Sequence, residues 1–217
     1  MVKATDNWMS EPSRNLSPPT GEGVVIDLGT GDGLFVYQAA RQNPGKFYIG
    51  IDATARPLEK ISEKIHRKPA KGSLPNVLYI QAAVEALPPE LNGVADEVHI
   101  HFPWGSLLRG VATGDETVLR NLRRVCAAGA LVEVVIGLDP QRDQSEIEAL
   151  GLKPLTNEFL EMTLIPRYEA HGFEVLEKRV LAPAEWPKLK TSWAKRLRGG
   201  AGRTLIYIIA RAVKVQT

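Results

Sequence analysis

The stretch from Val24 to Gly33, Val-Val-Ile-Asp-Leu-Gly-Thr-Gly-Asp-Gly, restricts the possible folds of this chain more than any other. Its first residues are apolar or β-branched, and glycine follows at every second position. This pattern predicts a buried strand, a tight turn and then a helix through Tyr37 and Ala40. Glycine lets the backbone pass close to a ligand, and free N–H groups at a helix N-terminus lie beside it. The stretch therefore predicts a ligand-binding turn in an α/β fold.

Two carboxylates, Asp27 and Asp32, accompany the glycines and restrict the ligand. A dinucleotide fold uses Gly-x-Gly-x-x-Gly to place a pyrophosphate on the helix N-terminus, whereas the spacing here is Gly-x-Gly-x-Gly. Carboxylates repel a pyrophosphate but suit an amino group, a sulfonium cation or ribose hydroxyls. The pattern favours S-adenosylmethionine (SAM) over a nicotinamide dinucleotide, and a glycine-rich turn that binds nothing is the alternative.

Chain length and composition favour a single domain. The 217 residues, 44% of them hydrophobic, suffice for one α/β domain with a substantial core. No apolar run approaches the ~20 residues that span a bilayer, and residues 1–23 read as a loose polar leader without a signal-like core. We therefore expect a cytoplasmic protein with no membrane partner and one domain over 24–217. Cys126 is the only cysteine, and we expect it to be a small buried residue after a helix.

The net charge of +2 conceals two basic segments. Residues 186–217 carry eight lysines and arginines and no acid, while residues 56–71 carry six basic residues against two acids. The rest of the chain therefore has a charge of −10. Clustered positive charge is typical of a surface that binds a polyanion, because phosphate contacts supply most of the affinity for nucleic acid. A solvated basic face without a partner is the alternative.

Apolar runs that alternate with helical segments predict a sheet. Beyond the first strand, further strands are expected at 47–52, 77–80, 95–102, 130–136, 173–180 and 204–212, the last two as an antiparallel hairpin. Helices are expected at 57–66, 116–124 and 160–171. Residues 137–172 are interpreted as an insertion that is irregular over 139–159, and 181–203 as a long linker. In this linker Trp193 lies among cations, a combination suited to stacking a base and contacting phosphates.

Several strand ends carry candidate binding residues. Asp52 ends the second strand about twenty residues beyond the glycines and is expected to bind ribose hydroxyls, although capping of the next helix is also possible. The small residues of Ala82–Val84 leave room for an adenine ring, and Glu85 can meet its edge. Trp104 follows the fourth strand in the crevice where open α/β sheets bind ligands, so we expect it to be exposed to substrate rather than packed in the core.

His99 and His101 lie two residues apart in the fourth strand and therefore share one face. Two histidines at this spacing can form a metal pair, but the sequence offers no evident third ligand. We therefore interpret them as structural residues and expect no metal.

Four segments together resemble the class I SAM-dependent methyltransferases, and more closely the aminoglycoside-resistance 16S rRNA (adenine-N1) methyltransferases of the Kam type. These segments are Ile26–Gly33, Lys68–Gly72, Phe102–Leu108 and Ser192–Leu197. The first is shared by many methyltransferases, and the other three together are specific. The resemblance implies a Rossmann-like, seven-stranded, mostly parallel sheet with an antiparallel C-terminal strand. It also implies a protein that methylates N1 of the decoding-site adenine in helix 44 of the 30S subunit and so confers resistance to kanamycin- and apramycin-type drugs. We expect this protein to be a monomer.

The resemblance further implies the roles of individual residues. Those that would hold SAM are Asp27, Gly29, Gly31, Asp32, Asp52, Ala53, Ala83, Val84, Glu85 and Ser106. The target adenine would lie between Trp104 and Trp193, with Ser106 and Thr191 near the reacting groups. Those that would contact the rRNA backbone are Lys64, Arg67, Lys68, Lys71, Lys195, Arg196 and Arg203.

The chemistry agrees with the lack of an evident catalytic base. Adenine N1 carries an in-plane lone pair and no hydrogen, so no proton has to leave before methyl transfer. The protein has only to extract the base, align it and exclude water. A tRNA methyltransferase acting on guanine N7 or adenine N1, a small-molecule methyltransferase, and a non-catalytic SAM-binding ribosome-associated factor are the alternatives.

Overall fold

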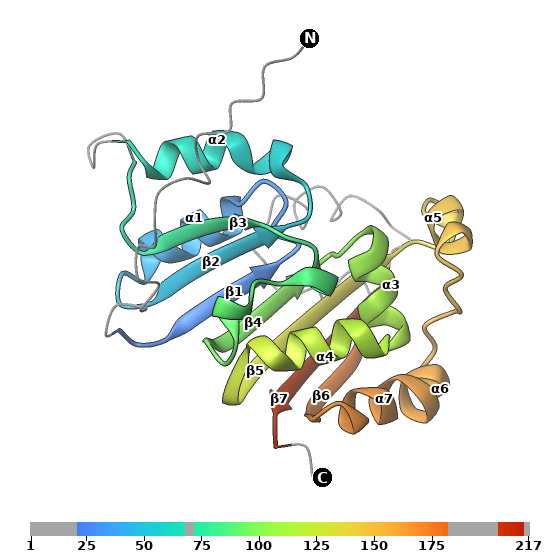
Figure 1. The fold of residues 1–217 in the computed structure, drawn as a ribbon. Coiled ribbons are helices and arrows are strands. Elements are labelled where there is room, and N and C mark those ends of the chain that lie inside the picture. The colour runs from blue at the N-terminus through green and yellow to red at the C-terminus, as the bar shows by residue number, and fades with distance from the viewer. Residues whose placement is uncertain (1–20, 68–71, 182–203, 215–217) are drawn as a thin grey trace.

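The computed structural model describes residues 21–67, 72–181 and 204–214 (Figure 1). Its strands are β1 (Val24–Leu28), β2 (Phe47–Asp52), β3 (Val77–Gln81), β4 (Ala95–His101), β5 (Cys126–Leu138), β6 (Phe173–Leu181) and β7 (Thr204–Ala212). Its α-helices are α1 (Leu34–Gln42), α2 (Ala55–Ile65), α3 (Gly105–Thr113), α4 (Glu116–Val125), α5 (Gln144–Ala149), α6 (Asn157–Phe159) and α7 (Ile165–Ala170). The leader and the linker expected from the sequence lie almost wholly outside the described residues, as do Lys68, Lys71, Thr191, Trp193, Lys195, Arg196 and Arg203.

The seven strands form one sheet in the order β3-β2-β1-β4-β5-β7-β6. The pairs among β1 to β5 are parallel, and β7 runs antiparallel to both of its neighbours. This arrangement confirms the predicted mostly parallel sheet with an antiparallel last strand. The strand order reverses at β1 and β4, because β2 and β3 follow β1 on one side and β4 and β5 lie on the other. The carboxyl ends of β1 and β4 therefore flank the crevice in which open α/β sheets bind ligands.

Helices cover the sheet on both faces (Figure 1). On one face Ile26, Val98 and Val132 pack with α3, α4 and α7, and on the other Val25 and Tyr48 pack with α1 and α2. Neighbouring residues of β1 thus belong to opposite cores, because side chains alternate along a strand. Within the described ranges, no helix has the length and apolar character needed to cross a membrane.

Four local features differ from the sequence expectation. The fourth strand ends at His101 because Phe102 has a φ of 51°, a left-handed conformation that a strand cannot continue. Helix α3 follows at once, although its sequence starts with Gly105 and predicts no helix. Helix α5 lies in the stretch expected to be irregular, where Asp139 Oδ1 accepts from the N–H groups of Gln141 and Arg142 in the turn before it. Strand β5 begins four residues earlier than expected, at the buried Cys126.

Candidate cofactor and substrate site

The glycine turn is tied to the end of β2 by its own backbone. Gly29, Gly31 and Gly33 have φ values of 74°, 58° and 68°, and such left-handed backbone strongly favours glycine. Gly29 N donates to the carbonyl oxygen of Ile51 at 2.8 Å, and Gly31 N donates to Asp52 Oδ2 at 2.8 Å. The turn therefore brings the residues after β1 against the residues that end β2.

Gly33 packs against an aromatic ring from β3. A Cβ atom at Gly33 would lie 2.6 Å from Tyr79 Cε1 and 2.8 Å from Ile61 Cγ2. The Tyr79 hydroxyl donates to the carbonyl oxygen of Gly33 at 2.7 Å. Burial raises the pKa of Tyr79 well above its ordinary value, so the hydroxyl stays protonated and remains a donor. Close packing as well as backbone conformation therefore requires glycine at this position.

A cleft of about 360 Å³ opens at the carboxyl ends of β1, β2 and β3 and at the start of α3. The predicted residues that line it are Gly29, Gly31, Asp52, Ala53, Ala83, Val84, Trp104 and Ser106. Ala82, which the sequence analysis placed beside the adenine ring, also lines the cleft. The lining residues that sequence reasoning did not name are Leu28, Ile51, Thr54, Phe102, Gly105 and Leu107. Most of these are apolar or small, so their residue types do not indicate a binding role. Only their positions, next to the strand ends that carry the polar candidates, could have indicated it.

The Asp52 carboxylate is held by two backbone donors. Its Oδ2 accepts from Gly31 N at 2.8 Å and its Oδ1 accepts from Thr54 N at 2.9 Å. A carboxylate has about four lone-pair sites, so about two remain for a ligand in the cleft. Asp52 therefore orders the turn before α2 and lines the cleft. It does not cap α2, whose N-cap residue is Thr54, and its contact with ribose hydroxyls stays a prediction.

Three of the acidic residues predicted to bind SAM do not line the cleft. Asp27 is 4% exposed, and burial raises the pKa of its carboxyl against the opposing effect of His101. Asp32 Oδ1 accepts from Leu34 N at 3.1 Å, at the start of α1. Glu85 lies in a 3₁₀ turn beside Val84 and is exposed. Contacts of these three with SAM stay predictions.

Trp104 lies at the rim of the cleft and is 50% exposed, which confirms the predicted exposure. The left-handed Phe102 turns the chain out of β4, and Gly105, with a φ of 59°, starts α3. Gly105 N also donates to Glu146 Oε1 of α5 at 3.2 Å. The loop that carries the indole is thus fastened between the sheet and α5. Its expected partners Trp193 and Thr191 lie outside the described residues.

Lys64 and Arg67 are the predicted rRNA-contacting residues that the structure describes. Lys64 Nζ lies 4.0 Å from the ring centroid of Tyr37, within the range of a cation–π contact. Arg67 is exposed and lies 3.6 Å from Glu63. Lys64 belongs to the last turn of α2 and Arg67 follows the C-cap His66, and their contact with RNA stays a prediction.

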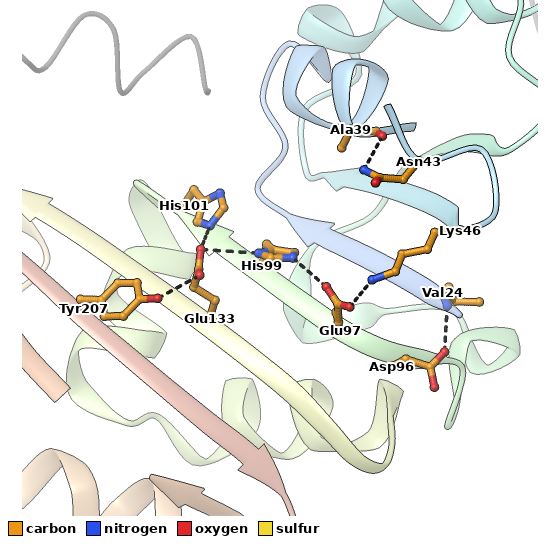
Figure 2. Close-up of polar contacts among 10 residues, drawn as sticks. All are labelled: Val24, Ala39, Asn43, Lys46, Asp96, Glu97, His99, His101, Glu133 and Tyr207. Atoms are coloured by element: carbon orange, nitrogen blue, oxygen red, sulfur yellow. Dashed lines mark hydrogen bonds and ion pairs between the residues drawn. The ribbon is translucent and has the colours of Figure 1, made fainter. Parts of the chain in front are cut away.

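The structure corrects the interpretation that His99 and His101 lack a third ligand. Glu133 of β5 lies beside both, with its Oε1 atom 2.5 Å from His101 Nε2 and 3.6 Å from His99 Nδ1 (Figure 2). Burial lowers the pKa of His99, but the carboxylates of Glu133 and Glu97 outweigh it and raise the pKa to about 9. The sequence alone could not identify Glu133 as a neighbour of the two histidines, because that contact depends on the register of β4 against β5.

A family model, related sequences and solved structures all match this chain to the same kind of methyltransferase. The family model of NpmA, a 16S rRNA (adenine(1408)-N(1))-methyltransferase, matches residues 13–212. The 16S rRNA (adenine(1408)-N(1))-methyltransferase from Streptoalloteichus tenebrarius is 43% identical to this chain over 181 residues, which are 83% of this chain and 82% of that protein. The crystal structure of the aminoglycoside resistance methyltransferase NpmB1 is 45% identical, with a TM-score of 0.77 over 90% of this chain and 89% of that one.

A second solved structure includes the cosubstrate. A tryptophan mutant of the 16S rRNA (adenine(1408)-N(1))-methyltransferase from Catenulisporales acidiphilia, crystallised with SAM, is 36% identical to this chain. Its TM-score is 0.81, and the match covers 91% of this chain and 89% of that one. On this evidence the chain belongs to the NpmA family of 16S rRNA (adenine(1408)-N(1))-methyltransferases.

Proposed function

We propose that this protein methylates N1 of adenine(1408), the decoding-site adenine of 16S rRNA helix 44, and thereby confers resistance to kanamycin- and apramycin-type aminoglycosides. The observation that carries the proposal is the half-exposed Trp104 at the rim of a cleft that the glycine turn and Asp52 also line. One wall of this cleft suits a nucleoside with ribose hydroxyls, and its rim offers an aromatic face to a second base.

The lining of the cleft fits SAM. Gly29 and Gly31 have no side chains that would fill the space beside the turn, and Asp52 offers carboxylate oxygens to ribose hydroxyls. Ala83 and Val84 leave a flat apolar wall for an adenine ring. When bound, SAM supplies an electrophilic methyl group on a positively charged sulfur.

The residues of this chain have to orient the target base and exclude water. N1 of adenine donates its lone pair to the methyl carbon, the carbon–sulfur bond breaks with its electrons left on sulfur, and no proton is transferred. Trp104 stacks on the extracted base, an interaction that contributes about 1–3 kcal/mol. The methylated ring is cationic, and an indole face stabilises a cation. Trp193 is proposed as the second face, with Ser106 and Thr191 near the reacting groups.

The basic segments are proposed to bind the rRNA backbone. Lys64 and Arg67 extend from the end of α2, and the segment 186–217 carries eight further cations without an acid. Such clusters bind phosphate without regard to sequence, so they position the enzyme while the cleft selects the base. We propose that the protein acts as a monomer on the assembled 30S subunit in the cytoplasm, where that subunit is found.

Methyl transfer from labelled SAM to intact 30S subunits and to tRNA tests the proposal. We expect label in the 30S subunit and none in tRNA. Trp104→Ala should transfer methyl groups about 5- to 150-fold less efficiently, while its SAM affinity measured by calorimetry stays within about threefold. Met162→Ala is the control, since Met162 is also an exposed apolar residue and does not line the cleft. Label in tRNA alone, or full transfer by Trp104→Ala, contradicts the proposal.

A further inference from the structure

A cluster of metal-ligating side chains lies outside the cofactor cleft. His99 and His101 of β4 and Glu133 of β5 each offer a ligand atom, and these atoms lie within 4.8 Å of one another. His99 and Glu133 are direct partners in the β4–β5 register, and His101 shares their face because side chains repeat every second residue. None of the three lines the cleft, so the methyl-transfer chemistry leaves this cluster without a role.

The separations suit one ion with three protein ligands. Two ligands at 2.0–2.1 Å from a tetrahedral zinc ion lie about 3.4 Å apart. His99 Nδ1 and Glu133 Oε1 are 3.6 Å apart, and His101 Nε2 and Glu133 Oε1 are 2.5 Å apart. The first separation fits without movement, and the second requires the Glu133 carboxylate to move away from His101 by about 1 Å.

The hydrogen bonding around the cluster is incomplete. The Nδ1 atoms of His99 and His101 are both buried, and neither has a hydrogen-bond partner among the described residues. The His101 side chain is only 3% exposed. His99 Nδ1 has only the 3.6 Å ion-pair contact with Glu133 Oε1, and an ion bound between these two atoms would replace that contact with two short bonds.

The surrounding groups resemble the outer shell of a metal site. Glu97 Oε2 lies 3.6 Å from His99 Nε2, the ring nitrogen that faces away from Glu133 (Figure 2). The Tyr207 hydroxyl donates to Glu133 Oε2 at 3.2 Å, which leaves Oε1 toward the histidines. Ligating histidines commonly present their second nitrogen to a carboxylate, and ligating carboxylates are themselves hydrogen-bonded. His99 and Glu133 are therefore each held by a polar contact on the side away from the proposed ion.

The charge of this region favours a cation. The buried Asp27 is the register partner of His99, so Asp27, Glu97 and Glu133 bring three carboxylates to one patch of the sheet. Lys46 forms an ion pair with Glu97 at 2.5 Å and offsets one of them. The Phe35 ring packs against both imidazoles in T-shaped contacts, at centroid distances of 5.6 and 5.1 Å. Protonated His99 offsets a second carboxylate, and a divalent ion bound there would take the place of that proton.

We propose that His99, His101 and Glu133 form a binding site for a divalent transition-metal ion, with Zn²⁺ as the best match to two imidazoles and one carboxylate and with water as the fourth ligand. The site joins β4 to β5 and does not share residues with the SAM cleft. It therefore binds its ion in the absence of SAM, and the proposal is independent of the methyl-transfer reaction.

Titration of the full-length, tag-free and EDTA-treated protein with Co²⁺ and then Zn²⁺ tests the site. We expect one Co²⁺ per chain with the intense visible absorption of a tetrahedral site, displaced by an equal amount of Zn²⁺. His101→Asn and Glu133→Gln should each weaken binding at least tenfold, whereas the control His171→Asn, which removes a histidine bonded to the Arg167 carbonyl, should not. Retained SAM binding shows that each variant is folded.

A measurement on the unmodified protein decides the matter if those variants do not fold. The chain has four histidines, and their imidazole nitrogens give separate signals in a long-range ¹H–¹⁵N spectrum. Addition of Zn²⁺ should shift the signals of His99 and His101 and leave those of His66 and His171 in place. Absence of stoichiometric binding, undiminished binding by His101→Asn, or shifts confined to His66 and His171 would overturn the proposal.

Discussion

Replacement of Gly33 by alanine tests whether Tyr79 fixes the ligand-binding turn. The new Cβ would lie 2.6 Å from Tyr79 Cε1 and 2.9 Å from its Cζ. The ring cannot move away freely, because its hydroxyl donates to the Gly33 carbonyl at 2.7 Å and that bond would have to stretch or break. The same side of the ring also faces Gly50, where a Cβ would be 2.8 Å from Tyr79 Cδ1. The substitution must therefore displace the turn, the ring or both.

The size of the effect follows from two separate terms. Gly33 has a φ of 68°, and left-handed backbone costs a residue with a Cβ about 1–2 kcal/mol. Overpacking of a filled site costs about 1–3 kcal/mol more. Gly93 also has a φ of 68°, but a Cβ there would meet nothing within 4 Å. Gly93→Ala should therefore lose only the first term, and the difference between the variants isolates the contact with Tyr79.

Urea unfolding of the two variants measures this difference through their midpoints. We expect Gly33→Ala to lose about 2–5 kcal/mol and Gly93→Ala about 1–2 kcal/mol. Calorimetry should also show weaker SAM binding in Gly33→Ala alone, because the turn positions Gly31 against Asp52. Equal losses of stability in the two variants, with equal SAM affinity, would refute the assigned role of the Tyr79 contact.

Three further predictions concern the cleft and the core. Asp52→Asn should weaken SAM binding about 10- to 100-fold in calorimetry, since hydrogen bonds to a charged group are worth about 1.5–3 kcal/mol; unchanged affinity would place the ribose elsewhere. Trp104→Ala should leave the melting temperature within about 2 °C, because the side chain is 50% exposed; a larger fall would make it a core residue. Burial raises the pKa of the Cys126 thiol to about 12, so it stays protonated at pH 8 and iodoacetamide should label it only in urea; rapid labelling of the folded protein would contradict its burial.

Much of the sheet could be predicted because local pattern and burial agree there. Val24–Leu28 and Phe47–Asp52 are continuous apolar runs before a polar turn, and both are strands of the parallel sheet. The same agreement located Asp52 and Trp104, since each stands at a strand end on the binding side of the sheet. The position of a residue could therefore be predicted where it depends on the local sequence pattern alone.

The remaining features depend on contacts between distant segments. Helix α3 begins at a glycine, and its amphipathic character becomes useful only when Leu108 is buried against the sheet. Asp27 is the register partner of His99, and only the pairing of β1 with β4 shows that the two residues are neighbours. Glu133 joins the two histidines only through the register of β5. Local pattern contains none of this information.

The position of the methyl group in 16S rRNA tests the central claim most directly. Intact 30S subunits are incubated with the protein and SAM, the rRNA is copied by reverse transcriptase, and the modified nucleoside is identified by mass spectrometry. The account predicts a stop at adenine(1408) of helix 44 and N1-methyladenosine as the product. A methyl group at another nucleotide, or none in 16S rRNA while tRNA is methylated, would contradict it.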